Sequence, residues 1–165
     1  MCGIFAYVGD NLAGQTILDG LRHLVYRGYD SAGIATIARD RTMDIRKYAG
    51  DISALAQDLD SSPMIGMSGL GHTRWATHGN ASVINAHPHV DSESSIVVVH
   101  NGMVENYVAI RNSLESEGYV FVTDTDTEVI PHLLRKFLNI GCSLAEAVRK
   151  SGSVIKGPHS IAVMD

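Results

Sequence analysis

Residues 1–9 have the sequence MCGIFAYVG, an apolar segment that ends in glycine and follows directly on the initiator methionine. Short apolar runs bounded by glycine are typical of buried β-strands. The segment therefore predicts a strand that begins almost at the N-terminus and holds Cys2 in a fixed place. Free cysteines are usually small buried hydrophobic residues, and this is the simplest interpretation of Cys2.

Composition limits the partners that the chain is expected to have. Its 165 residues include 13 Lys and Arg against 18 Asp and Glu, with a net charge of -5 and no basic run that would attract nucleic acid. No apolar stretch approaches the roughly 18 to 20 residues that span a bilayer, and no basic segment precedes an apolar run. We therefore expect a cytoplasmic protein with neither nucleic-acid nor membrane partners. The two cysteines, Cys2 and Cys142, are too few for a disulfide scaffold.

Hydrophobic periodicity predicts a mixture of helices and strands. Helical spacing covers residues 17–25, 52–59 and 107–114, and two capping boxes, Thr125-x-x-Glu128 and Ser143-x-x-Glu146, predict further helices. Strand patterns cover residues 3–9, 33–37, 44–48, 95–100, 119–122 and 160–164. Residues 73–80 mix small, aromatic and basic side chains, which is typical of a binding loop. Because no repeat or linker interrupts the pattern, we predict one layered α+β domain.

A second interpretation makes Cys2 a nucleophile. Removal of Met1 would leave a thiol and a free α-amine on one residue, and an α-amine, with a pKa of about 7.7 to 8.0, can act as a general base near neutral pH. Arg27, in the first glycine-flanked loop, could supply a cation that favours the thiolate. Acyl transfer also needs donors for the oxyanion, and Asn101-Gly102 offers a side-chain amide and an unhindered backbone N–H. A plain hairpin turn is the competing interpretation of this Asn-Gly pair.

Other polar residues could act as ligands for a substrate or a metal. In residues 72–79, HTRWATHG, the fork of Arg74 could bind a carboxylate beside hydroxyl and imidazole donors, although a solvated loop is the alternative. Among the eight histidines, His87 and His89 would lie on one face of an extended segment, and a zinc site could add His72, His78 and His100. No spacing of Cys, Asp or Glu completes a recognised metal pattern, so we expect no metal and no cofactor.

Six separated motifs, in order, resemble the glutaminase domain of the class II glutamine amidotransferases, in the version found in glutamine:fructose-6-phosphate aminotransferases (glucosamine-6-phosphate synthases). The resemblance runs over the whole chain and implies an N-terminal nucleophile hydrolase fold, a four-layer αββα sandwich. The motifs are Cys2-Gly3-Ile4, residues 26–33 (YRGYDSAG), residues 72–79, residues 85–89 (NAHPH), His100-Asn101-Gly102 and residues 125–128 (TDTE).

The resemblance implies a role for each candidate site residue. Cys2 would attack the side-chain amide of glutamine, its own amine would move the proton, and Asn101 with the Gly102 N–H would hold the oxyanion. Arg74, Thr77 and His78 would bind the substrate α-carboxylate, and Asp126 with the Gly102 carbonyl would bind its α-ammonium group. Trp75 would gate the passage of ammonia. Arg27 would lie beside the nucleophile, and His87 would form part of the pocket wall.

The expected function is hydrolysis of L-glutamine through a Cys2 thioester, supplying ammonia for glucosamine-6-phosphate synthesis from fructose-6-phosphate in hexosamine biosynthesis. Residues 1–165 are expected to be an incomplete glutaminase domain, truncated on its C-terminal side and lacking the sugar isomerase domains of the full-length enzyme, itself expected to be a homo-oligomer. The alternatives are a catalytically silent glutamine-binding or assembly module, and the glutaminase domain of another amidotransferase such as amidophosphoribosyltransferase.

Overall fold

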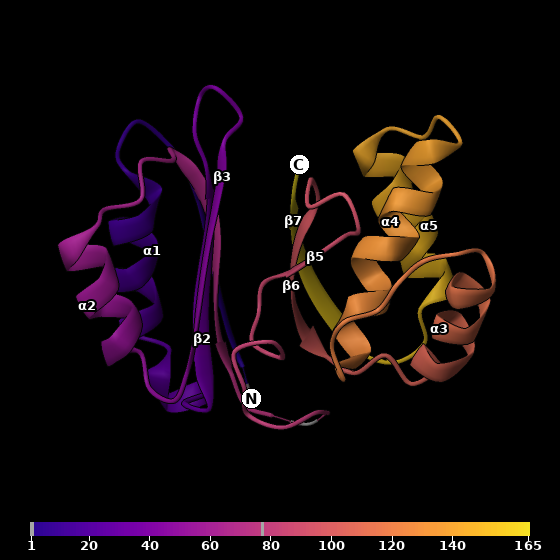
Figure 1. Cartoon of the computed structure of the whole chain (residues 1–165), viewed down its shortest axis with the longest axis horizontal. Helices are drawn as coiled ribbons and strands as arrows, with labels where there is room; N and C mark the ends of the chain where they lie inside the picture. The colour runs from indigo at the N-terminus through magenta and orange to yellow at the C-terminus, as the bar shows by residue number, and fades with distance from the viewer. Residues whose placement is uncertain (1, 77) are drawn as a thin grey trace.

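The chain folds into four layers, two helical layers enclosing two β-sheets that face each other (Figure 1). The computed structural model describes residues 2–76 and 78–165. Helices α1 (Ala13–Arg22) and α2 (Ser53–Ser61) form one outer layer, and α3 (Tyr107–Ser116), α4 (Val129–Asn139) and α5 (Leu144–Val154) form the other. The expected αββα sandwich is thereby confirmed.

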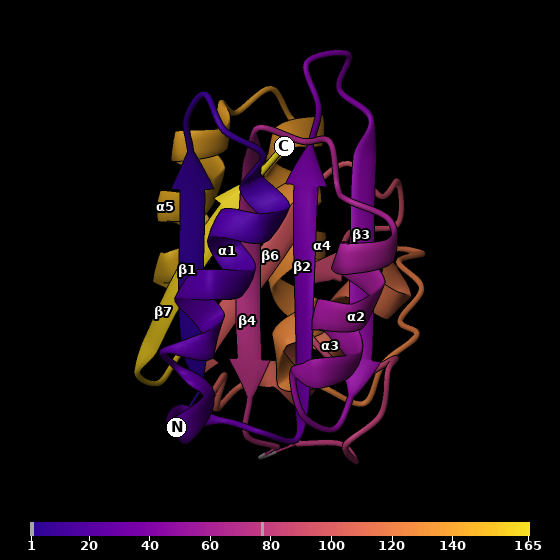
Figure 2. The same cartoon turned by 90° about the vertical axis from the view of Figure 1, so that its left-hand side faces the viewer.

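The first sheet, which we call sheet A, contains four antiparallel strands. Its strands lie in the order β1 (Gly3–Val8), β4 (Ser68–Arg74), β2 (Ser31–Ile37) and β3 (Met43–Ala49), side by side behind α1 and α2 in Figure 2. The pairing of β1 with β4 places Gly3 opposite Thr73. This register brings the residues just before β1 next to those just after β4, so Cys2 and Trp75 become neighbours although they are far apart in sequence.

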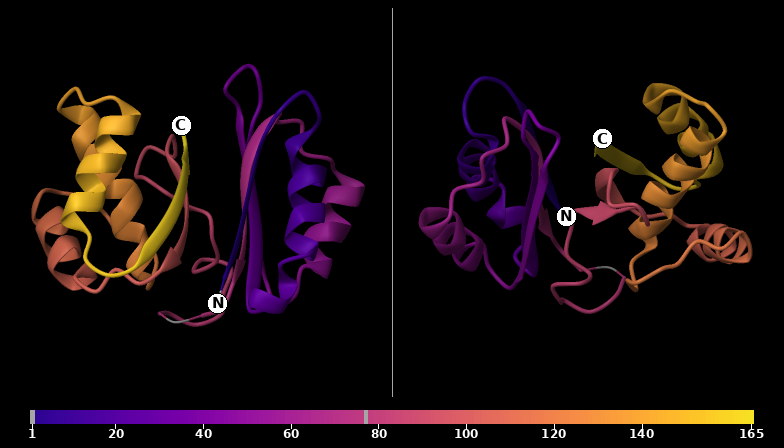
Figure 3. Two further views of the ribbon diagram at one scale, coloured as in Figure 1. Left: turned by 180° about the vertical axis from the view of Figure 1, so that it is seen from behind. Right: turned by 45° about the horizontal axis from the view of Figure 1, so that its top comes forward.

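The second sheet, sheet B, is smaller and faces sheet A. Its strands lie in the order β5 (His89–Val90), β6 (Val97–Gly102) and β7 (His159–Met164), and all pairs are antiparallel. Short 3-10 turns η1 (Val25–Arg27) and η2 (Asp126–Glu128) connect elements near one end of the sandwich. Figure 3 shows both halves from two further directions, with the N-terminus at the lower end of the sheets in its left panel.

Alternating apolar residues build a separate core at each interface of the four layers. On β6, Val97 and Val99 face sheet A, whereas Val98 faces the helices behind sheet B. A third cluster of buried residues, including Ile17 and Leu21 of α1, fills the space between sheet A and its helices. The period-two pattern of the central strands therefore distributes their side chains to two cores at once.

The structure agrees with most predicted elements and corrects three. The first helix spans residues 13–22 rather than 17–25, because its first turn consists of the small buried residues Ala13 and Gly14, which periodicity does not detect. The predicted strand at 119–122 is wrong, since this segment is irregular. The capping box at Ser143 is confirmed, but the one at Thr125 is wrong because the Thr125 side chain caps no helix. The Glu128 carboxylate instead accepts from the backbone N–H groups of Val122 and Thr123, each at 2.8 Å.

Candidate functional site

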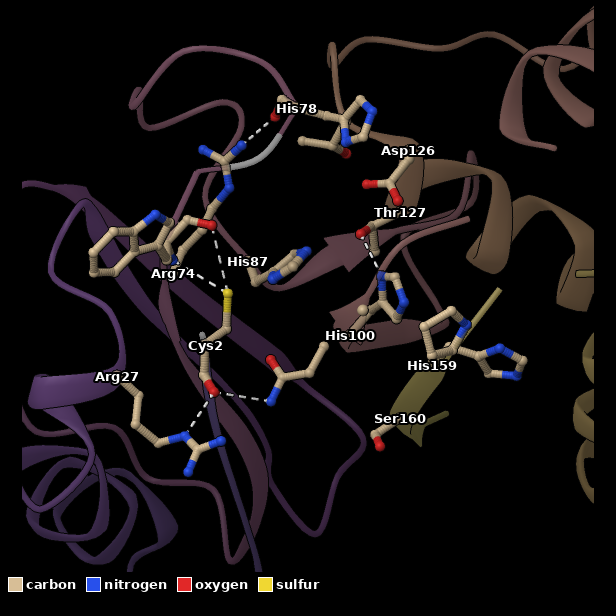
Figure 4. Close-up of a pocket in the computed structure, with 15 residues that line it drawn as sticks. Cys2, Arg27, Arg74, His78, His87, His100, Asp126, Thr127, His159 and Ser160 are labelled. Carbon is tan, nitrogen blue, oxygen red and sulfur yellow. Dashed lines mark hydrogen bonds between the residues drawn. The ribbon is translucent and has the colours of Figure 1, made fainter. Parts of the chain in front are cut away.

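A cavity of about 580 Å³ opens where the ends of strands from both sheets meet. Because neighbouring antiparallel strands run in opposite directions, the start of β1 and the end of β4 share one rim of sheet A, and the end of β6 and the start of β7 share one rim of sheet B. The cavity is lined by Cys2, Arg27, Arg74, Trp75, His78, His87, His100, Asn101, Gly102, Thr125, Asp126, Thr127, Pro158, His159 and Ser160 (Figure 4).

Cys2 lies in this cavity with its sulfur against the backbone of Trp75. The Trp75 N–H donates to Sγ at 3.2 Å, and Sγ lies 3.6 Å from the Trp75 carbonyl oxygen. The carbonyl oxygen of Cys2 accepts from Arg27 Nε at 3.2 Å and from Asn101 Nδ2 at 3.1 Å (Figure 4). These contacts fix the backbone of Cys2 from two sides and leave its sulfur on the cavity surface.

Asp30 positions the segment that presents Trp75 to the sulfur. Its carboxylate accepts from the Ala76 N–H at 2.6 Å, and its own N–H donates to the Arg74 carbonyl at 3.0 Å. The rings of Tyr29 and Trp75 also meet edge to face, with centroids 5.3 Å apart. The loop around residues 29–30 therefore clamps the chain immediately after β4.

Asn101 and Gly102 lie at the end of β6 and pair with β7, so the hairpin interpretation of this Asn-Gly pair is wrong. Gly102 has φ +131°, a conformation that other L-residues rarely adopt. A Cβ at this position would lie 2.1 Å from the Pro158 carbonyl oxygen. Glycine is therefore required here, and the backbone on the cavity side remains unhindered.

Groups of opposite charge lie in the same cavity. Arg74, which is 4% exposed, donates to the carbonyl oxygens of residues 78–80, including Asn80 at 3.2 Å. Burial lowers the pKa of its guanidinium, and negative charges that include Asp30 and Asp126 partly offset this effect. Asp126 is also 4% exposed, and its Oδ2 accepts from the Val104 N–H at 2.7 Å. A cavity with both a cation and an anion suits a zwitterionic ligand.

Several cavity residues lie outside the ten predicted site residues. His100 is buried, and its Nδ1 lies 2.8 Å from Thr127 Oγ1. Burial lowers the pKa of His100 to about 4, opposed by the nearby charge of Asp126, so the ring is neutral at physiological pH. Neighbouring residues of a strand point to opposite faces, so His100 and Asn101 lie on opposite faces of β6. This alternation could have predicted from the sequence that His100 contacts different residues from Asn101. His159 and Ser160 enter from β7, which no motif singled out.

The structure brings nine of the ten predicted site residues into one cavity. These are Cys2, Arg27, Arg74, Trp75, His78, His87, Asn101, Gly102 and Asp126. Thr77, the tenth, lies outside the described residues. Within residues 2–76 and 78–165, no group of three or more His, Cys, Asp or Glu side chains is arranged to hold a metal ion. In the same ranges, no helix has the length and apolar character needed to cross a bilayer.

The four-layer αββα sandwich, with Cys2 at the cavity end of its first strand, has the fold of the N-terminal nucleophile amidotransferases. The family described as the glutamine amidotransferase domain matches residues 32–149, and the chain belongs to this family.

The chain is also similar over nearly its whole length to aminotransferases that act with glutamine and fructose-6-phosphate by name. The glutamine–fructose-6-phosphate aminotransferase (isomerizing) of Thermococcus kodakarensis is 46% identical over 164 residues, which is 99% of this chain and 27% of that protein. The enzyme of the same name from Escherichia coli K12 is 44% identical over 165 residues, again 27% of its length. The chain thus spans about a quarter of these relatives.

A solved structure of glutamine phosphoribosylpyrophosphate amidotransferase from B. subtilis, complexed with ADP and GMP, has the same fold. It matches 99% of this chain and 35% of its own with a TM-score of 0.84 and 28% sequence identity. Since sequence identity is higher to the fructose-6-phosphate aminotransferases, the chain is more similar to that branch than to this structure.

Proposed function

We propose that the protein hydrolyses L-glutamine to glutamate and ammonia, with Cys2 as the nucleophile. The observation that best supports this proposal is the position of the Cys2 sulfur on the cavity surface, beside the Trp75 N–H and across from Asn101 and Gly102. A silent glutamine-binding module would not need a thiol and oxyanion donors facing one space.

The proposed reaction has two steps. The Cys2 sulfur attacks the side-chain carbonyl carbon of glutamine, while the thiol proton passes to the α-amine exposed by removal of Met1 and then to the leaving nitrogen, which departs as ammonia. Water then attacks the γ-glutamyl thioester, giving glutamate and the free thiol. The negative charge that develops on the carbonyl oxygen in each step is stabilised by Asn101 Nδ2 and the Gly102 N–H.

The same cavity supports recognition of the amino-acid end of glutamine. Arg74 and His78, with Thr77, are proposed to bind the α-carboxylate, and Asp126 with the Gly102 carbonyl is proposed to bind the α-ammonium group. Arg74 also donates to the carbonyls of residues 78–80, so it shapes the loop that carries its partners. His87 forms part of the cavity wall, and Arg27 donates to the Cys2 carbonyl, through which it is proposed to orient Cys2. Trp75, which also lines the cavity, is proposed to control the exit of ammonia.

We further propose that the ammonia serves glucosamine-6-phosphate synthesis from fructose-6-phosphate, in the cytoplasm. The 44–47% identity to glutamine–fructose-6-phosphate aminotransferases supports this use. Residues 1–165 would then be the glutaminase domain of a homo-oligomeric enzyme and would work together with sugar isomerase domains.

The test is ammonia release from glutamine by the purified chain, with removal of Met1 verified by intact mass. We expect activity in the wild type, loss in Cys2→Ala, and covalent labelling of Cys2 by a glutamine-like electrophile. Chain that retains Met1 should be inactive, because its Cys2 nitrogen is an amide and not an amine.

Cys142→Ser is the matched control, since Cys142 packs among the helices behind sheet B and its Sγ contacts Lys150 Nζ at 3.2 Å. It should remain fully active and should still be labelled at Cys2. Activity that survives in Cys2→Ala would refute the nucleophile, and a processed wild type that binds glutamine without releasing ammonia would support the silent module.

A further inference from the structure

His72 of β4 lies fully buried between the two sheets, directly behind the side chain of Asn101. Its Nε2 is 2.9 Å from Asn101 Oδ1 and 3.1 Å from the carbonyl oxygen of His100. On the other side, Asn101 Nδ2 donates to the Cys2 carbonyl at 3.1 Å. Sheet A therefore reaches the Asn101 amide of sheet B through both Cys2 and His72.

The partners of these groups determine the position of each proton. A backbone carbonyl can only accept a hydrogen bond, so the contact with the His100 carbonyl requires His72 Nε2 to carry a hydrogen. The same N–H then faces the oxygen of Asn101. At the other end, the Cys2 carbonyl also only accepts, so it must face the NH₂ group of Asn101. Both ends independently give the same orientation of the carboxamide.

Burial and packing keep the His72 ring in this state. Burial lowers the pKa of His72 to about 3, although its hydrogen bonds to Asn101 and the His100 carbonyl oppose the shift, so the ring is neutral with one N–H. The His87 ring packs edge-on against it, with centroids 4.0 Å apart and an angle of 84° between the planes. Its Nδ1 lies 3.0 Å from His72 Nδ1 and 2.9 Å from His72 Nε2, and with the His72 hydrogen on Nε2 the free Nδ1 of His72 can accept from His87 Nδ1–H. His89 then packs against His87 in the same manner at 4.6 Å. This row of imidazoles leaves little room for His72 to turn.

We propose that His72 is a positioning residue for glutamine hydrolysis, holding the Asn101 carboxamide with its NH₂ group directed towards the nucleophile. The inference rests on the proposed function, because that function makes Asn101 Nδ2 an oxyanion donor. Without His72, the amide can rotate by 180° and place its oxygen where negative charge develops. Loss of one oxyanion donor typically lowers kcat by about 10² to 10³ fold.

The test compares His72→Met with His72→Gln, two side chains of similar length of which only Gln can donate to Asn101 Oδ1. We expect His72→Met to lower kcat by about 10² to 10³ fold with KM for glutamine within about threefold. His72→Gln should recover most of the rate. Equal rates in the two variants would overturn the proposal, as would a loss expressed in KM alone.

Two further measurements separate positioning from a general loss of structure. In a double mutant, His72→Met together with Asn101→Ala should be no slower than Asn101→Ala alone, because His72 acts through Asn101. NMR of the wild-type ring nitrogens should find the hydrogen of His72 on Nε2, and an Nδ1–H form would overturn the proposal even if a variant failed to fold. A processed wild type that releases no ammonia contradicts the proposed function, whereas an active wild type with a fully active His72→Met contradicts only this inference.

Discussion

The carbonyl oxygen of His87 lies against Gly33 so closely that a Cβ on residue 33 would be 2.2 Å from it. Gly33 belongs to β2, in the middle of sheet A, and His87 belongs to the segment that crosses between the sheets. Because Gly33 has no side chain, the His87 backbone can pack directly against β2, and His87 in turn forms part of the cavity wall.

Gly33→Ala should reduce both stability and activity, because the backbone at His87 must move. We expect the free energy of unfolding to fall by about 1–3 kcal/mol, the usual cost of overpacking a well-packed interior. Denaturant unfolding and ammonia release measure the two effects. Gly152→Ala in α5 is the control, since a Cβ there meets no atom within 4 Å and should stabilise the helix by about 0.5–1 kcal/mol. A neutral Gly33→Ala would show that the segment is not held against β2.

Glu128→Gln should destabilise the loop that precedes Asp126. The buried Glu128 carboxylate accepts from the N–H groups of Val122 and Thr123 and from Thr123 Oγ1 at 2.7 Å. An amide offers only one accepting atom, so a buried donor loses its partner at a cost of about 1–3 kcal/mol. Chemical denaturation measures the change. Glu115→Gln, on the exposed face of α3, should alter stability by less than about 0.5 kcal/mol.

Lys47 should make stability rise with pH in the alkaline range. Burial lowers its pKa from 10.5 to about 8, opposed by the charge of Glu128, while Nζ donates to the carbonyls of Ile84 at 3.1 Å and Pro88 at 3.3 Å. Between pH 8 and 10.5 the unfolded chain binds this proton and the folded chain does not, so the free energy of unfolding increases with pH. Unfolding curves across this range should show a smaller increase in Lys47→Met. The exposed variant Lys156→Met should follow the wild type, and parallel curves for all three would refute the assignment.

Asp126→Asn should weaken glutamine binding more than it slows the chemical steps. The asparagine oxygen can still accept from the Val104 N–H, but the charge proposed to pair with the substrate ammonium is lost. Hydrogen bonds to charged groups contribute about 1.5–3 kcal/mol, so KM should rise by about 10- to 100-fold. Steady-state kinetics measure this change. Asp124→Asn is the control, because Asp124 is exposed and its Oδ2 accepts from Asn85 Nδ2. It should change KM by less than about threefold. An unchanged KM in Asp126→Asn would exclude this ammonium site.

The sequence predicted those helices and strands whose signal lies within a few neighbouring residues. It did not predict features that depend on contacts between residues far apart in the chain. The β-branched run of β6 identified a central strand, and Ser143 with Glu146 identified a helix start, because both signals lie within a few residues. Residues 119–122 have the same alternation as a strand, but no other strand pairs with them. Phe121 packs on His132 with ring centroids 4.6 Å apart, and Glu128 takes the free N–H groups.

The candidate site followed the same division. Motifs predicted nine residues that meet in the cavity, because Cys2, Asn101 and Asp126 have side chains suited to chemistry. His72 stands in one of those motifs, yet nothing in the sequence indicates that its partner is Asn101, 29 residues away on the opposite sheet. That relationship depends on how sheet A and sheet B face each other.

The hydrogen bond between Cys2 and Asn101 joins residues separated by 99 positions, one directly before β1 of sheet A and one in β6 of sheet B. At a synthesis rate of about 5–20 residues per second, roughly 5–20 s pass between the incorporation of Cys2 and that of Asn101. During that interval the nascent chain carries the Cys2 thiol without the Asn101 side chain that is proposed to stabilise the oxyanion. Contacts across such long sequence separations also form slowly, so chemical competence should be among the last properties acquired, after both sheets have formed and docked.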